Sequence, residues 1–460
     1  MTRTSRAARS SLHVLVALGV SVMATACGSS ADGTPAGSDG ADAGAGAADG
    51  STGGGDAGST KADASIDGVV AVPLAACTPL VYAADVAIGA QSFQLIVDTG
   101  STSLGVAGAG CTNCSVTPLY NPGTTGVDRK KTASAQFGSG KWSGEVFGDT
   151  VGFAPKPTTA LDFVSITAQT GFFQAGSTCG GKAYQGLLGF GRSSAAVSGT
   201  KGLFDQLVSA ESIADVFATS LCDGGGTLWL GGYDPAATTG APQYTPFTTD
   251  VASSYYYAVS LTTVDVAGTT VPVASASYND TILDTGTSAF LLGETAYKAM
   301  TAAISKSAGF SQVFGAQGAQ WFASTNGGVS CANLTQTKAQ LDATLPPLTL
   351  TFAENVQVQA PATESYLMPY PGAGWCNALV SQAQGQNFPI ASIMGAPVLR
   401  SSVVITDRAN ARVGFAPHKP CAGAAFKADV AANAVSGARA ANVTITQGAF
   451  KHRLPTFLTR

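Results

Sequence analysis

A nine-residue pattern occurs twice in this chain and constrains its fold more than any other feature. Residues 95 to 103 read Leu-Ile-Val-Asp-Thr-Gly-Ser-Thr-Ser, and residues 281 to 289 read Thr-Ile-Leu-Asp-Thr-Gly-Thr-Ser-Ala. Each copy is a short apolar run, typical of a buried β-strand, that ends in Asp-Thr-Gly and a hydroxyl residue. Asp98 and Asp284 therefore occupy equivalent positions in the two copies.

A second repeated element follows each copy. Gly186-Leu187-Leu188-Gly189 comes after the first, and Ser392-Ile393-Met394-Gly395 comes after the second. A single Asp-Thr-Gly also makes a common turn, but turn formation does not explain two copies with matching downstream strands. Two β-rich halves of this kind predict two similar lobes that face each other across a cleft.

Two carboxyl groups across a cleft indicate a hydrolase that uses no covalent intermediate. One ionised aspartate takes a proton from a water molecule, while its protonated neighbour polarises the carbonyl group that the water attacks. Two adjacent carboxyls do not easily both ionise, so Asp98 and Asp284 would share one proton over an acidic range. The neighbouring residues fit supporting roles, because glycine permits a tight turn and a hydroxyl can hydrogen-bond a carboxylate or brace the two loops. These supporting residues are Thr99, Gly100, Ser101, Thr285, Gly286 and Thr287.

Composition excludes several other classes of protein. The net charge is −4 and charged residues make up only 11%, so the chain lacks the basic surplus of a nucleic-acid binder. Only three histidines occur, and His13, His418 and His452 lie near the two ends of the chain. A Ser–His or Cys–His nucleophile, or a His-ligated zinc site, needs imidazoles inside the fold. We therefore expect no metal and no organic cofactor.

The N-terminal residues predict export. Three arginines precede an apolar stretch from Leu12 to about Val22, and Ala24-Thr25-Ala26-Cys27 resembles a lipobox, so residues 1–26 are expected to be a signal peptide. Cys27 would then carry the lipid; the alternative is ordinary secretory cleavage near Ala26, with Cys27 incidental. Residues 27–65 contain almost only Gly, Ala, Ser, Thr and Asp, which predicts a disordered tether.

The chain has nine cysteines. If Cys27 is lipidated, an even number remains in an exported body, which is consistent with up to four disulfides. Cys111-Thr-Asn-Cys114 is a close pair, and a small disulfide loop explains it better than a zinc knuckle, because no second close pair exists. Spacing alone does not fix the remaining partners, among them Cys77, Cys179, Cys222 and Cys421.

From about Val81 to Pro417 the sequence resembles the pepsin-like aspartic peptidases. Besides the two Asp-Thr-Gly loops, Phe137-Gly138-Ser139-Gly140 is similar to the tip of the family's substrate-binding flap, and residues 404–417 are similar to its C-terminal strands. Cys179 and residues 186–192 resemble the nepenthesin-like branch. The export features suggest a bacterial member.

The resemblance implies an all-β, bilobal fold with two pseudo-symmetric β lobes and the active site in the cleft between them. It also implies an endopeptidase that acts on polypeptides at acidic pH next to apolar residues, with Asp98 mainly protonated and Asp284 as the general base. Cys331 and Cys376 correspond to the second-lobe disulfide of the family. The expected domains are an N-terminal lobe at 66–245, a C-terminal lobe at 246–421 and an extension of unknown role at 422–460.

The chain departs from the family pattern at the flap. Phe137 stands where the family usually has Tyr, and Gly105 stands where it has the Trp that bonds this Tyr, while Trp142 could restore some packing. No basic prosegment is visible in residues 28 to 64. Because the flap is altered, an alternative function is a catalytically weak or inactive binding or inhibitor protein on the same fold. In either case we expect a monomer that contacts a membrane only through a lipid on Cys27, in the outer membrane, at the cell surface or secreted.

Overall fold

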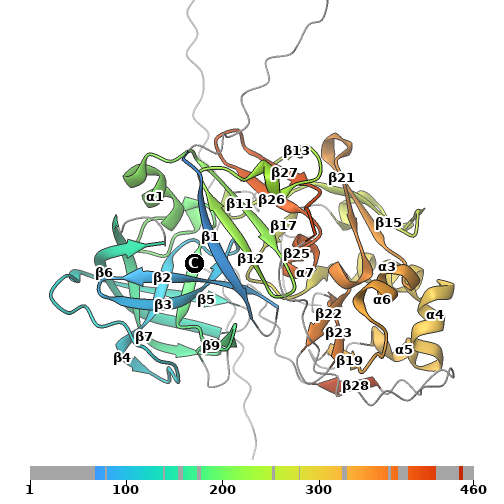
Figure 1. The fold of residues 1–460 in the computed structure, drawn as a ribbon, viewed down its shortest axis with the longest axis horizontal. Helices are drawn as coiled ribbons and strands as arrows, with labels where there is room; N and C mark the ends of the chain where they lie inside the picture. Colours follow the sequence, from blue (N-terminus) through green and yellow to red (C-terminus); the bar gives the residue numbers. More distant parts are fainter. Residues whose placement is uncertain are drawn as a thin grey trace, which may run out of the picture. The chain divides into compact units, whose positions relative to one another are not determined.

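β-Strands dominate the computed structural model. The structure describes residues 68–77, 80–137, 140–153, 159–173, 178–250, 254–278, 280–323, 329–370, 374–381, 392–420 and 445–448. The predicted signal peptide, Cys27 and the tether up to residue 65 lie outside these ranges, as do Gly138, Ser139 and Cys421. The predicted all-β class is confirmed, because helices are few and short beside the sheets (Figure 1).

Thirteen of the described strands form one large sheet. In their order across the sheet they are β13 (Gln243–Pro246), β27 (Arg412–Ala416), β26 (Val403–Asp407), β11 (Val216–Leu221), β12 (Gly225–Leu230), β1 (Val70–Ala76), β2 (Tyr82–Ile88), β3 (Gln91–Asp98), β10 (Gly186–Gly189), β4 (Leu104–Thr112), β7 (Thr159–Thr170), β6 (Gly140–Gly152) and β5 (Val127–Phe137). The last six residues of β3 are all buried, and all of them except Gln94 and the final Asp98 are apolar, as in a strand covered on both faces.

The second half of the described chain builds smaller sheets. One has the order β14 (Ala258–Val259), β17 (Thr281–Asp284), β25 (Ser392–Gly395), β18 (Phe290–Leu292) and β24 (Leu379–Ser381). A second sheet has the order β16 (Thr269–Thr270), β15 (Leu261–Val266), β20 (Leu348–Phe352) and β21 (Gln357–Ala360). A third has the order β22 (Leu367–Tyr370), β23 (Gly374–Asn377), β19 (Val329–Ala332) and β28 (Ile445–Gly448). The pair β8 (Thr178–Cys179) and β9 (Lys182–Ala183) belongs to the first half.

The two halves repeat one five-strand arrangement. In the first half β3 runs parallel to β10, β10 antiparallel to β4, and β4 parallel to β7. In the second half β17, β25, β18 and β24 pair in the same order and the same directions. The strands β2 and β14 flank β3 and β17 as antiparallel neighbours. The sequence duplication is therefore a duplication of strand topology.

Most of the described α-helices lie in the second half of the chain. The first half has α1 (Leu203–Glu211), and the second half has α3 (Glu294–Ser305), α4 (Ala308–Phe314), α5 (Gly318–Trp321), α6 (Lys338–Thr344) and α7 (Ala396–Leu399). Helix α6 begins at a capping box, in which Thr337 accepts from the Gln340 amide and the Gln340 side chain accepts from the Thr337 amide. Aromatic side chains of α4 and α5, Phe310, Phe314 and Trp321, pack together in the core.

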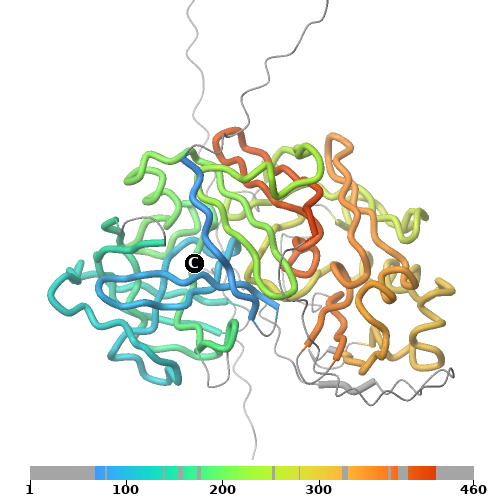
Figure 2. The backbone as a smooth tube through the Cα atoms, viewed as in Figure 1, coloured from blue at the N-terminus to red at the C-terminus, as the bar shows by residue number. Residues whose placement is uncertain are grey.

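Strands from late in the chain complete the large sheet. β26 pairs with β11, and β27 pairs with β13, so residues 403–416 lie beside strands of the first half (Figure 2). The sheet therefore continues across the predicted lobe boundary at 245/246, which remains a prediction.

Three disulfides join described cysteines. Cys331 pairs with Cys376, as the resemblance implies, and Cys111 pairs with Cys114 in the expected small loop. The third joins Cys77 to Cys179, a pairing that the sequence left open. Within the predicted C-terminal extension, residues 445–448 form β28, which pairs antiparallel with β19.

None of the helices in the described ranges has both the length and the apolar character needed to cross a bilayer.

Candidate active site

The two aspartates end equivalent strands. Asp98 is the last residue of β3 and lies opposite Gly189 in the parallel ladder with β10. Asp284 is the last residue of β17 and lies opposite Gly395 in the parallel ladder with β25. The two apolar-apolar-Gly segments identified in the sequence are thus the strands that pair with the strands ending in Asp98 and Asp284.

Each carboxylate is held by its own loop in the same way. The Gly100 amide donates to Asp98 Oδ1 over 2.9 Å, and the Ser101 hydroxyl donates to Oδ2 over 2.7 Å. In the second loop the Gly286 amide and the Thr287 hydroxyl donate to the two oxygens of Asp284 over 2.8 and 2.5 Å. The predicted supporting residues therefore fix the orientation of both carboxylates.

The glycines of the loops allow the two aspartates to approach each other. A Cβ atom added to Gly100 would lie 2.6 Å from Asp284 Cγ, and one added to Gly286 would lie 2.4 Å from Asp98 Oδ1. Each loop thus passes directly over the carboxylate of the other lobe. Any side chain at either position would collide with an aspartate, so glycine is required there for close approach rather than for backbone conformation.

Two threonines tie the loops together by four hydrogen bonds. The Thr99 amide donates to Thr285 Oγ1 over 3.1 Å, and the Thr285 amide donates to Thr99 Oγ1 over 3.0 Å. Each hydroxyl then donates across the pair, Thr99 to the Leu283 carbonyl and Thr285 to the Val97 carbonyl, both over 2.8 Å. Both side chains are buried, so these bonds are shielded from water and set the spacing of the two lobes.

The two aspartates differ in electrostatic environment. Asp98 is 7% exposed and Asp284 is 2% exposed. Burial, followed by the negative charge of Asp98, raises the pKa of Asp284 well above its usual value, although the Thr287 hydroxyl opposes this shift. This shift favours Asp284 as the carrier of the shared proton. The resemblance implies the reverse distribution, with Asp98 protonated.

A cavity opens beside the Asp98 loop. Its lining residues are Gly100, Ser101, Thr102, Ser103, Ala135, Gln136, Phe137, Trp142, Leu187, Ala195, Val197 and Tyr256. Phe137 and Gly140 pair at the ends of β5 and β6, so both described flap residues are in a hairpin, and Phe137 reaches the cavity. Gly138 and Ser139, the other two flap residues, lie outside the described ranges.

Trp142 and Ile166 fill the space beside Gly105. A Cβ atom at Gly105 would lie 3.3 Å from Ile166 Cδ1 and 3.6 Å from Trp142 Cζ2, and the Trp142 side chain is buried. Its ring lies 6.2 Å from that of Phe137, between centroids. Within the described part of the chain Trp142 Nε1 has no hydrogen-bond partner, which fits a flap whose neighbouring aromatic residue has no phenol. The expected packing role of Trp142 is thus seen in detail.

Two residues that line the cavity were not predicted from the sequence. Phe172 and Phe173 are buried in the first-half core and do not line the described cavity. Leu187 and Tyr256 do line it. Successive side chains of a strand point to opposite faces, and Leu187 and Leu188 belong to two different core clusters. This alternation in Gly-Leu-Leu-Gly could have identified Leu187.

The negative charges of both carboxylates affect the pKa of Tyr256. Burial raises its pKa above the usual value, and the charges of Asp284 and Asp98 raise it further. No local pattern marks this residue, since it precedes β14 and meets the first-half cavity only in the folded chain.

Among the described residues no cluster of three or more His, Cys, Asp or Glu side chains is arranged to hold a metal ion. The polar side chains that line the cavity are those of Ser101, Thr102, Ser103, Gln136 and Tyr256.

Comparison with known proteins agrees with this geometry. A family model described as eukaryotic aspartyl protease matches residues 81–418, well over half of the chain. A beta-secretase from Strongylocentrotus purpuratus is 26% identical over 374 residues, covering 75% of this chain and 67% of that protein. Pepsin-2B from Gadus morhua is 29% identical over 335 residues, covering 71% of this chain and 92% of that protein.

A third relative is cathepsin E from Cavia porcellus, which is 27% identical over 372 residues, or 76% of this chain and 84% of that protein. All three relatives are eukaryotic proteins, so the bacterial origin and the nepenthesin-like features are not confirmed.

Proposed function

Because the chain belongs to the pepsin-like aspartyl protease family, whose members act on polypeptides, we propose that it is an active aspartic endopeptidase with Asp98 and Asp284 as its catalytic dyad. The observation that carries this proposal is the pair of equivalent, mutually enclosed carboxylates. Each accepts hydrogen bonds from its own loop, and each loop glycine lies against the carboxylate of the other lobe.

The proposed reaction needs only these two residues and water. The ionised carboxylate removes a proton from a water molecule held between the pair, and the resulting hydroxyl attacks the peptide carbonyl. The protonated carboxyl donates to the carbonyl oxygen, which forms a tetrahedral diol, and collapse of the diol passes a proton to the departing amine. The raised pKa of Asp284 keeps one proton on the pair over a wide acidic range.

The proposed cleavage preference is for a bond next to an apolar residue. The side chains of Phe137, Trp142 and Leu187 give the cavity beside the Asp98 loop an apolar wall. Ser101 and Gly100 form the side of the cavity next to the dyad. A substrate side chain of moderate size would fill this space with its scissile bond held near the carboxylates.

The test is proteolysis by the purified chain at pH 3 to 6, using an unfolded protein and then an apolar peptide as substrates. Asp98→Asn and Asp284→Asn keep the shape of the site and remove one ionisable group each, so both are expected to lose activity by at least about 10³-fold. A statine-type transition-state mimic should block the unaltered protein. Proteolysis that survives either substitution would overturn the mechanism.

The same experiment separates the alternative function. An unaltered protein that binds the statine mimic or an unfolded polypeptide but cleaves nothing at any pH would be a binding protein on this fold. The observation that favours this alternative is the flap, where Phe137 lacks the phenol of the family residue and Trp142 Nε1 has no partner among the described residues.

The protein is further proposed to act outside the cytoplasm, held to a membrane through a lipid on Cys27 or released after cleavage near Ala26. Radiolabelled fatty acid should be incorporated by the full chain and not by Cys27→Ser. Equal labelling of both chains would exclude Cys27 as the attachment site. The monomeric state is likewise proposed, and light scattering at several concentrations tests it.

A further inference from the structure

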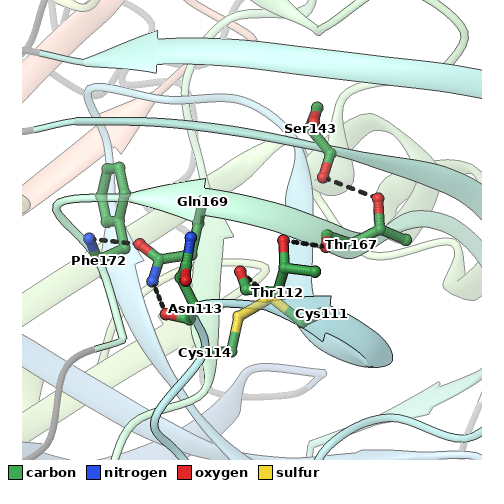
Figure 3. The surroundings of a disulfide bond; sticks show 8 residues. All are labelled: Cys111, Thr112, Asn113, Cys114, Ser143, Thr167, Gln169 and Phe172. Atoms are coloured by element: carbon green, nitrogen blue, oxygen red, sulfur yellow. Dashed lines mark hydrogen bonds between the residues drawn. A yellow bond between two sulfur atoms is a disulfide. The ribbon is translucent and has the colours of Figure 1, made fainter.

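The loop closed by Cys111 and Cys114 lies next to the base of the flap. Its disulfide spans three residues of sequence and both cysteines are partly exposed, whereas Cys77, Cys179, Cys331 and Cys376 are buried. The disulfide holds Asn113 in the left-handed backbone region, with φ of 67°. This conformation directs the Asn113 carbonyl towards β7 (Figure 3).

Gln169 joins this loop to the segment that follows β7. Its Nε2 donates to the Asn113 carbonyl in a close contact, and its Oε1 accepts from the Phe172 amide over 2.8 Å. The side chain is 5% exposed, so both polar ends of a buried amide are used. A backbone hydrogen bond, from the Ser115 amide to the Phe173 carbonyl over 2.9 Å, also joins the two segments.

The connection continues to the flap through aromatic contacts. The Phe172 ring packs edge-on against Phe137, with 5.3 Å between centroids, and Phe137 also contacts Trp142. Gln169 itself pairs with Trp142 across the β6–β7 ladder. Figure 3 shows a second line of bonds, from Thr112 to the Thr167 carbonyl and from Thr167 to the Ser143 carbonyl in β6, both 3.4 Å long.

We propose that Gln169, held by the Cys111–Cys114 loop, is a positioning residue that fixes Phe137 over the substrate cavity. The role rests on the proposed peptidase function, because it concerns how the flap presents its aromatic residue to substrate. Gln169 does not touch the dyad. It acts through Phe172, whose amide it holds and whose ring supports Phe137.

Two substitutions at Gln169 test this role. Gln169→Met keeps the size of the side chain and removes both hydrogen bonds, so kcat/KM should fall about tenfold, with KM rising more than kcat falls. Gln169→Glu is isosteric and, when protonated, donates to the Asn113 carbonyl as Gln does. Its activity relative to the unaltered enzyme should therefore be near normal at pH 3–4 and decline towards pH 6, whereas the deficit of Gln169→Met is independent of pH.

The matched control is Gln185→Met. Gln185 is also buried and bridges three backbone groups, accepting from the Gln94 amide and donating to the carbonyls of Thr117 and Ala183. The three backbone groups that it bridges do not include Phe172. Its replacement should lower the melting temperature without a pH-dependent change in kcat/KM. Equal kinetic effects at Gln169 and Gln185 would overturn the proposal.

A measurement that needs no catalysis separates this proposal from the peptidase function. Hydrogen–deuterium exchange of the amides of β5 and β6 should rise in Gln169→Met and in the double variant Cys111→Ser/Cys114→Ser, and stay unchanged in Gln185→Met. Unchanged exchange in the first two variants overturns the positioning role whatever the activity. Raised exchange in a protein that cleaves nothing supports the positioning role and overturns the peptidase function instead.

Discussion

The two Asp-Thr-Gly loops share one scaffold and differ in what surrounds it. The strands β3, β10, β4 and β7 repeat as β17, β25, β18 and β24 with the same directions, and each carboxylate receives the same two donors. The described cavity, however, lies beside the Asp98 loop, and Tyr256 is its only lining residue from the second half. In the proposed peptidase, the duplicated part of the chain would therefore supply the chemistry, and unduplicated elements such as the flap would set specificity.

Replacing either loop glycine should have the largest effect and should affect both halves alike. Gly100→Ala and Gly286→Ala each place a methyl group against the carboxylate of the other lobe, so each should lower kcat by about 10²-fold or more. Steady-state kinetics with a peptide substrate measures this. Gly105→Ala is the control, because its methyl group would meet Ile166 at 3.3 Å and Trp142 at 3.6 Å, and its activity should change little. A large loss of kcat in only one of the two glycine variants would show that the two loops are not equivalent.

The next largest effect is expected from substitutions of Thr99 and Thr285, which should lower the free energy of unfolding. Thr99→Val and Thr285→Val each remove a hydroxyl that accepts one buried bond and donates another, so each should cost about 1–3 kcal/mol in the free energy of unfolding. The double variant should cost less than the sum, because both hydroxyls serve the same contact. Urea unfolding measures these values, and strictly additive losses would show that the two loops are independent.

The raised pKa of Asp284 predicts that the pH dependence of stability comes more from Asp284 than from Asp98. The folded chain binds this proton more tightly than the unfolded chain does, so the stabilisation is present below pH ~4 and is lost as pH rises towards the folded pKa. Asp284→Asn should therefore raise the melting temperature by about 2–4 °C at pH 7 and leave it unchanged at pH 3. Asp98→Asn removes only the second cause of the shift, so its gain should be smaller. An equal gain from both variants contradicts the asymmetry.

The smallest effect should come from the hydroxyl of the second loop. Thr287 lowers the pKa of Asp284, so Thr287→Val should raise that pKa further and move the alkaline limb of the pH–activity profile upward by about 0.5–1 unit. Thr287→Ser keeps a hydroxyl like that of Ser101 and should leave the limb in place. A downward shift in Thr287→Val would assign the limb to another group.

The repeated elements could be predicted because each lies within a few residues of sequence. Asp98, Gly100 and Ser101 form a local loop, and Asp284 repeats it, so the pattern alone indicated both carboxylates and their donors. The family resemblance extended this to Phe137 and to the Cys331–Cys376 pair. Such features depend on short-range geometry, which a sequence displays directly.

The remaining features depend on contacts between distant segments. Tyr256 joins the cavity only after the second half docks, and Gln169 is recognisable as a link only once Asn113 and Phe172 are seen beside it. The raised pKa of Asp284 was also out of reach, because its largest cause is burial, which depends on packing in the folded chain.

The pairing of β26 with β11 has a consequence for how the protein is made. A ribosome delivers β11 nearly two hundred residues before β26, so the growing chain carries an open strand edge throughout synthesis of the second half. The first half therefore cannot complete its large sheet on its own. A chain cut short before residue 403 would keep that edge exposed and be prone to aggregation, so completion of the large sheet has to wait for β26 and β27.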